Sequence, residues 1–564
     1  MQQPGLRKKQ LLLLAVTLAV TATAAGCSKS GGGSGEGAAS PSATAGGELK
    51  PTNGKFDPPV TITTVRGMPA AATYKNGETA DNNVHYKWAK DKLGIEIKNL
   101  WSVVDTNAAY GNKLKLALSA NEELPDILYA EGQVAQLLIE SGKFQDAGAL
   151  FDKYASETWK NAMKEDPSVW NEYARGGKRY GIPMLDYDYN NDPVLWVRED
   201  WAQKLNVQAP KTLDDYEKLL DAFTNGDPDG NGKKDTYGVA PAFKATYNDS
   251  FNLGWVFGAY GALPNTWTKA ADGTLAYGSV QPQIKQGLAK LRDWAAKGYI
   301  PTEAGLWDAG KAGAFMAAGK AGTFSGPYWS EAWPMGDMSK NDPNAKFVTY
   351  PLPTGSDGKS MHFSTHPYKG GLFINKSMKH PEVFFAYANY LFDNEADPKA
   401  GSEFENGWAK GYDWDLVDGK VTTDLTKIPG GGVRVFFYSL LPQGARIPSQ
   451  NVKALVKLAQ TGKPETPYES YWNTLAPDIE KKSATNVWNQ KQFAVRGEFT
   501  AGTTATMQEK GDYLNKLEME TFGAIIAGSK PLDEFDKFVQ TWKAQGGDKI
   551  TQEVNEWYKS VAQK

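Results

Sequence analysis

The sequence predicts an α/β protein whose helices cover both faces of its sheets. Short runs of β-branched and aromatic residues alternate along the chain with segments of helical spacing, and this alternation is typical of α/β folds. The 564 residues exceed the size of one compact core and predict roughly two to four lobes. The hydrophobic share of 41% and the charged share of 23% indicate a folded chain.

The first part of the chain contains three predicted strand and helix units. The β-branched run VTITTV at 60–65 predicts a buried strand. Helical spacing over 84–93 then precedes a second strand at 95–101. The third unit has a helix at 114–118 and a strand at 125–129.

The same alternation resumes at 193–197, where PVLWV predicts another buried strand. In PKTLDD at 210–215, Thr212 is a natural N-cap, with two acidic residues in the first turn of a helix that runs to about Phe223. Later elements are predicted as a helix ending near Ala318, a strand ending at Gly326, strands at 347–353 and 371–374, and helices at 381–392 and 535–542.

The N-terminus has the order of an export sequence. Arg7, Lys8 and Lys9 form a positive region, and an apolar run at 11–25 is followed by Cys27, the one cysteine of the chain. This order resembles a bacterial lipoprotein signal, which implies that residues 1–27 are the signal segment and that Cys27 carries an acyl anchor such as palmitate. The alternative is an ordinary secretory peptide with an incidental cysteine.

Residues 28–55 are predicted to be a flexible tether, because 28–47 consist almost entirely of Gly, Ser, Ala, Thr and Pro and cannot bury a core. No later segment reaches the apolar length of a transmembrane helix, so we expect membrane contact through the lipid only. The net charge of −3 gives no basic field, which excludes nucleic acid as the expected partner.

The segment 227–238, DPDGNGKKDTYG, has the spacing of a calcium-binding loop. Gly232 stands at the sixth position, where such loops turn sharply, and Gly238 stands at the twelfth, where a calcium sensor needs a glutamate. The loop is therefore predicted to hold a structural calcium ion rather than to act as a switch. The expected ligands are the side chains of Asp227, Asp229, Asn231 and Asp235 and the carbonyl of Lys233.

No enzyme motif stands out. The sequence contains no HExxH, no CxxC and no GxSxG in its folded part, and GLWDAGK at 305–311 lacks the hydroxyl residue of a phosphate loop. A glycosidase needs only two facing carboxylates, and a sequence cannot exclude such a pair. We therefore predict a protein that is not an enzyme and keep a surface glycosidase as an alternative.

Several segments together resemble the extracellular solute-binding proteins of ABC importers, in particular the large carbohydrate-type lipoproteins of Gram-positive bacteria. The resemblance covers nearly the whole chain. It rests on the lipoprotein signal and tether and on ELPDILYA (123–130), DPVLWVREDWAQKL (192–205), GKAGTFSGPYW (319–329), GGLFINKSMKHPEVFFAYANYLF (370–392) and the C-terminal helices.

The resemblance implies a two-lobe periplasmic-binding-protein-like fold with a hinge and an interlobe cleft. The N-terminal lobe is expected to contain 56–188 and 368–410, and the second lobe 189–367 and 411–564. Closure of the hinge around a solute would be the working motion. The chain would act as a monomer on the extracellular face of the cytoplasmic membrane and deliver an oligosaccharide to ABC permease subunits.

The resemblance also implies where the ligand binds. A sugar has apolar ring faces and a rim of hydroxyls, so its site needs flat aromatic rings and polar side chains. Tyr129 and Glu131 are expected to face the cleft from the first lobe, with Arg66 as a further contact. The other candidates are Tyr328, Trp329 and Trp333 in the second lobe, Tyr187 at the crossover, and Trp408 and Trp414 in a glycine-punctuated loop. Packing in the core or in loops is the alternative for each ring.

The sequence thus predicts a lipid-anchored receptor that binds an oligosaccharide without catalysis. A receptor for peptides or other solutes on the same fold is the first alternative, and a glycosidase is the second. A calcium-binding adhesin is disfavoured because one such loop does not make a repeat array.

Overall fold

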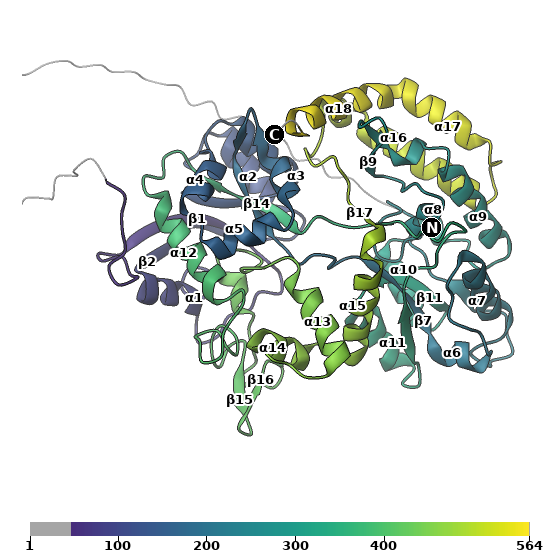
Figure 1. Ribbon diagram of the computed structural model, residues 1–564, viewed down its shortest axis with the longest axis horizontal. Helices are drawn as coiled ribbons and strands as arrows, with labels where there is room; N and C mark the ends of the chain where they lie inside the picture. Colours follow the sequence, from purple (N-terminus) through teal and green to yellow (C-terminus); the bar gives the residue numbers. More distant parts are fainter. Residues whose placement is uncertain (1–46, 563–564) are drawn as a thin grey trace, which may run out of the picture. The chain divides into compact units, whose positions relative to one another are not determined.

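The computed structural model describes residues 47–562 (Figure 1). The predicted signal segment, its lipidation site Cys27 and most of the tether lie outside the described residues. Residues from Glu48 onward form one compact unit. Within 47–562, no helix has both the length and the apolar character needed to cross a membrane.

The first group of strands forms two small sheets. Strands β1 (Val60–Met68) and β2 (Ile95–Val104) pair in parallel. Strand β14 (Tyr368–Ile374) pairs antiparallel with both β3 (Ile127–Ala130) and β6 (Gly181–Leu185), so a late segment of the chain completes an early sheet. The predicted strands at 60–65, 95–101, 125–129 and 371–374 are confirmed within a few residues.

Helices cover these strands. The helices of this group are α1 (Val84–Trp88), α2 (Ala109–Ser119), α3 (Gly132–Glu140), α4 (Ala147–Tyr154), α5 (Glu157–Lys164) and α12 (Pro381–Asn394). Helix α12 packs against both α4 and α5 (Figure 1), and α4 also contacts β6. Two short strand pairs accompany them, β4 (Ala174–Arg175) with β5 (Lys178–Arg179) and β15 (Asp415–Val417) with β16 (Lys420–Thr422).

The second group is built on a mixed four-stranded sheet. Its order is β12 (Phe347–Tyr350), β7 (Pro193–Arg198), β11 (Ala321–Pro327) and β8 (Tyr237–Val239). Strand β7 is antiparallel to both of its neighbours, and only β8 and β11 run in parallel. Thr212 caps α7 (Leu213–Asn225) through a reciprocal capping box with Asp215, as its sequence context predicts.

The rest of the second group consists of helices and short strands. They are α6 (Glu199–Lys204), α8 (Gly254–Gly258), α9 (Ile284–Ala296), α10 (Ala309–Ala317), α11 (Gly336–Asn341), β9 (Trp267–Lys269), β10 (Leu275–Tyr277), β13 (His362–Phe363) and β17 (Ala494–Val495). The C-terminal helices are α13 (Gln450–Thr461), α14 (Pro467–Leu475), α15 (Asp478–Gln490), α16 (Ala505–Ile526), α17 (Glu534–Trp542) and α18 (Asp548–Ala562).

Two large hydrophobic clusters form the core. The larger cluster draws its residues from 194–352 and 452–554, and the second draws them from 56–185 and 372–445. Residues 433–445 pack with the second cluster and with Met68, although the predicted lobe boundary assigns them to the other lobe. The division into lobes remains a prediction, and these contacts favour placing its last boundary near residue 446.

A buried carboxyl group joins α16 to the larger cluster. Glu518 has no exposed surface and accepts hydrogen bonds from Ser279 Oγ at 2.6 Å, Tyr277 OH at 2.9 Å and Asn265 Nδ2 at 2.7 Å. Burial raises the pKa of Glu518 to about 7, because a carboxylate loses more solvation than a carboxylic acid.

This pKa predicts a dependence of stability on pH. The folded protein holds the Glu518 proton at pH values where the unfolded chain has lost it, so the free energy of unfolding falls as pH rises from about 4.5 to about 7. In Glu518→Gln, the decrease in the free energy of unfolding over this pH range should be smaller by about 1–3 kcal/mol. The measurement is the melting temperature from pH 4.5 to pH 8, with exposed Glu520→Gln as control. An unchanged pH slope in Glu518→Gln would contradict the assignment.

Candidate functional site

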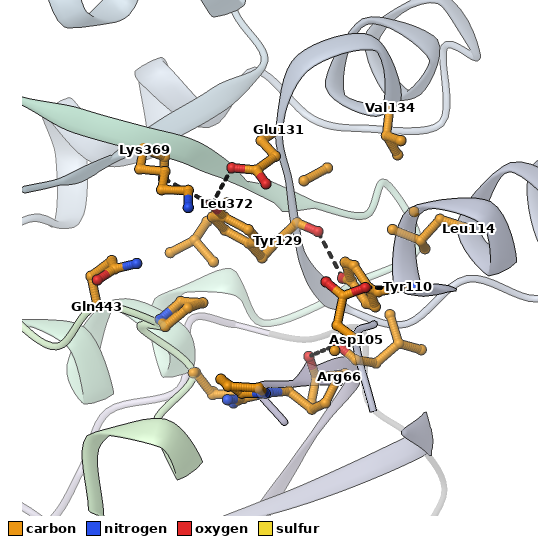
Figure 2. Close-up of a pocket in the computed structure, with 18 of the residues that line it drawn as sticks. Arg66, Asp105, Tyr110, Leu114, Tyr129, Glu131, Val134, Lys369, Leu372 and Gln443 are labelled. Carbon is orange, nitrogen blue, oxygen red and sulfur yellow. Dashed lines mark hydrogen bonds between the residues drawn. The ribbon is translucent and has the colours of Figure 1, made fainter. Parts of the chain in front are cut away.

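The first pocket has a volume of about 480 Å³ and collects side chains from distant segments (Figure 2). Strands β1, β3 and β14, helix α2 and the segment 436–443 supply its walls. Three residues predicted from the sequence, Arg66, Tyr129 and Glu131, line it together. Its other polar lining residues include Lys369, Gln443, Asp105, Lys115 and Gln133.

The Tyr129 hydroxyl makes two polar contacts in this pocket. Its hydroxyl lies 3.1 Å from both Glu131 Oε2 and the carbonyl oxygen of Lys369. Burial, together with the charge of Glu131, raises the pKa of Tyr129, so the phenol stays protonated and donates. Gly370 permits this approach, because a Cβ atom there would come within 2.4 Å of the phenol oxygen and its φ is +65°.

Arg66 reaches the opposite wall of the pocket and is itself buried. Its guanidinium donates to the carbonyls of Phe437 at 2.7 Å and Tyr438 at 3.2 Å, and to that of Ser439. These bonds fix the segment 437–439 against β1. The structure therefore gives Arg66 a positioning role at the pocket, with most of its donors bonded within the protein.

A second pocket of about 400 Å³ adjoins the first, because Phe436 and Gln443 line both. Tyr187 and Trp408, also predicted from the sequence, line it together. Its lining also includes Glu395, Asp413, Arg434, Arg446, Tyr468, Tyr471 and Trp472.

Two carboxyl groups of the second pocket bind their own chain. Trp408 Nε1 donates to Glu395 Oε1 at 2.9 Å, while both oxygens of Asp413 accept backbone N–H groups, those of Trp408 and Ala409, at 2.8 Å. Burial raises the pKa of Glu395 to about 7 and that of Asp413 to about 6. The bonded oxygens anchor the loop that contains Trp408.

The remaining predicted rings lie elsewhere and line neither pocket. Tyr328 is 3% exposed and donates to Asn451 Oδ1 at 2.7 Å, so its ring has no free face for stacking. Trp329 Nε1 donates to the carbonyl of Asn190 at 2.7 Å, and Trp414 is half-buried. Trp333 is 38% exposed and packs edge-on against a buried phenylalanine.

Sequence reasoning missed several lining residues. Lys369 and Gln443 carry no local pattern, and only long-range packing brings them beside Tyr129. Tyr468, Tyr471 and Trp472 had a usable pattern, because their i, i+3, i+4 spacing places three aromatic rings on one face of α14.

The predicted calcium loop has a turn held by its own side chains. The Gly232 N–H lies 3.2 Å from an Asp227 carboxylate oxygen, and the Lys233 N–H donates to Asn231 Oδ1 at 2.7 Å. The Asn231 amide nitrogen donates to Asp229 at 2.8 Å and to Asp235 at 3.1 Å. These hard oxygen groups around one turn fit calcium chemistry. In the described residues, however, no three His, Cys, Asp or Glu side chains gather as a metal site.

The chain belongs to the family of bacterial extracellular solute-binding proteins, whose model matches residues 71–398. Over 493 residues it is 24% identical to the lipoprotein LipO of Bacillus subtilis, covering 85% of this chain and 90% of LipO. It is also 25% identical over 490 residues to the polygalacturonan/rhamnogalacturonan-binding protein YtcQ of the same organism, with the same coverage.

Solved structures with this fold include the ABC-transporter substrate-binding protein FusA of Streptococcus pneumoniae in complex with kestose. That structure has a TM-score of 0.59 at 17% identity and covers 90% of this chain and all of FusA. A FusA structure with an EF-hand mutation, in complex with fructo-nystose, has a TM-score of 0.57 at 18% identity, with the same coverage. The predicted α/β solute-binding fold is thereby confirmed.

Proposed function

We propose that the protein is an oligosaccharide receptor of an ABC importer, anchored to the extracellular face of the membrane through a lipid on Cys27. It acts as a monomer, binds the sugar without cleaving it and presents it to permease subunits. The observation that carries the proposal is the group formed by Tyr129, Glu131 and Lys369 in the first pocket.

This group offers what a sugar requires. Tyr129 supplies an aromatic ring, Glu131 accepts hydrogen bonds from hydroxyls, and the Lys369 ammonium donates to them. Cations and carboxylates are nearly balanced over the pocket, which suits a ligand that presents both donors and acceptors. The sugar-binding relatives support the same ligand class.

The second pocket bears on the glycosidase alternative. Two buried carboxyl groups with raised pKa values are what such an enzyme uses. Both Asp413 oxygens and Glu395 Oε1 accept protein donors, however, which leaves these groups poorly placed to reach a glycosidic oxygen. We therefore assign Glu395 and Asp413 to the support of the Trp408 loop.

A thermal-shift screen tests the function. The probes are oligogalacturonides, fructooligosaccharides, monosaccharides and short peptides, with reducing-end release assayed in the same wells. We expect a selective rise in melting temperature with one oligosaccharide series and recovery of intact sugar. Release of reducing ends would establish a glycosidase, and a shift with peptides alone would overturn the ligand class.

We further infer that the loop at 227–238 binds a structural calcium ion. Asp227, Asp229, Asn231 and Asp235 would hold it through their side chains and Lys233 through its carbonyl. The support is the turn conformation described above, together with the EF-hand mutation studied in FusA. A bound divalent ion would neutralise the clustered carboxylates and so stabilise the turn.

Removal of calcium is expected to lower the melting temperature by about 2–6 °C without changing the choice of sugar, because an ion that binds only the folded state stabilises it. The double variant Asp227→Asn/Asp229→Asn should melt at the calcium-free temperature with or without the ion. Magnesium at equal concentration is the control ion. Identical melting curves before and after complete calcium removal would refute the site.

A further inference from the structure

A group of buried polar side chains supports the wall of the second pocket from behind. Tyr468 is nine-tenths buried and lines the pocket. Its hydroxyl has almost no exposed surface and lies beside the side chains of Trp472, on the same face of α14, and Asn451 in α13. These polar atoms therefore face one another, and contact with a ligand is left to the side chains that face the pocket.

The walls of this pocket are aromatic. Trp408, Phe436, Tyr471 and Trp472 line it, and Tyr471 is 38% exposed. Rings of this kind pack against the apolar faces of sugar rings, while Arg434 and Gln443 in the same lining suit the hydroxyls at the rim. The lining therefore has the two chemical properties that a sugar residue needs.

The two arginines of the second pocket differ in whether their guanidinium groups are already paired within the protein. Arg446 pairs with Asp186 and lies over the ring of Tyr187, with its guanidinium carbon 4.5 Å from the ring centroid. Arg434 is exposed and makes no side-chain hydrogen bond or ion pair with the described residues. The N–H groups of its planar guanidinium can therefore donate to ligand oxygens.

The second pocket also lies next to the first one. Phe436 and Gln443 line both spaces, so only these two side chains are shared between the two sites. The first pocket has a volume of about 480 Å³ and the second a volume of about 400 Å³. Each volume lies within the range of roughly 300–1,000 Å³ that is usual for ligand sites.

We propose that the second pocket holds further sugar residues of the same oligosaccharide whose first residues occupy the first pocket. This inference rests on the proposed function and adds to it a ligand length and a second binding surface. Tyr471 and Trp472 stack with the distal residues, and Arg434 and Gln443 donate to their oxygens. Affinity therefore rises with chain length until the second pocket is filled.

Calorimetric titration of a length series tests the proposal. Oligogalacturonides and fructooligosaccharides of two to six residues are titrated into the wild-type protein and into Arg434→Ala/Tyr471→Ala. We expect the wild-type Kd to fall at least tenfold from the shortest to the longest bound member, and this ratio to approach one in the double variant. The matched control is Tyr513→Ala/Lys516→Ala on α16, which should keep the wild-type ratio because both residues are exposed and line neither pocket.

The outcomes separate this inference from the proposed function. The second pocket would not be a sugar site if affinity did not depend on oligosaccharide length, or if the double variant kept the wild-type ratio of Kd values between the shortest and longest oligosaccharides. Either result would leave the receptor function intact. Failure of every oligosaccharide to bind the wild-type protein would overturn the receptor function and this inference with it.

Discussion

Replacement of Arg66 by methionine is expected to lower the free energy of unfolding by about 3–5 kcal/mol. The guanidinium is buried and donates to the carbonyls of Phe437, Tyr438 and Ser439. Methionine would fill much of the space but leave these acceptors without their donors. Because the bonds join β1 to a segment about 370 residues away, nothing local replaces them.

Chemical denaturation of the wild-type and variant proteins measures this effect. Arg66→Lys should lose roughly half as much stability, since a single ammonium reaches fewer carbonyls than a guanidinium. Arg292→Met is the matched control, because Arg292 is only half-buried and donates to one carbonyl, that of Lys530. A loss below about 1 kcal/mol in Arg66→Met would show that the 437–439 segment is held in another way.

The second large effect concerns ligand affinity. Tyr129→Ala should weaken oligosaccharide binding by about 100-fold, because it removes both an aromatic ring of the first pocket and the hydroxyl that orients Glu131. Tyr129→Phe keeps the ring and should cost only about tenfold.

Titration calorimetry with the sugar selected in the screen measures both variants. Tyr513→Ala, at a half-exposed tyrosine on α16, controls for the general loss of a ring. An affinity for Tyr129→Ala within threefold of wild type would remove Tyr129 from the binding site. A common melting temperature among the proteins would show that altered affinity does not reflect unfolding.

Local patterns were enough to predict much of the fold. The β-branched run at 60–65 and the capping context of Thr212 each specify their own element, because the determining interactions lie within a few residues. The direction of the strands was harder to predict. Strand β7 runs antiparallel to β11 and β12, and that arrangement depends on the path of the connections rather than on the strand sequences.

The candidate site was only partly predictable for the same reason. Tyr129 ends the predicted strand at 125–129 and Glu131 follows it, and both do line the first pocket. Tyr328 follows a strand in a similar way, yet it lies inside the larger cluster and bonds to Asn451 on α13. The difference arises from helix packing more than 100 residues along the chain, which no local pattern contains.

The crystal structure of the complex with the oligosaccharide chosen by the screen tests the central claim most directly. The proposed function predicts an intact sugar in the first pocket, in contact with Tyr129 and Glu131, and the further inference predicts that it continues past Phe436 to Trp472. A sugar bound only on the outer surface, or a cleaved product in either pocket, would contradict the account.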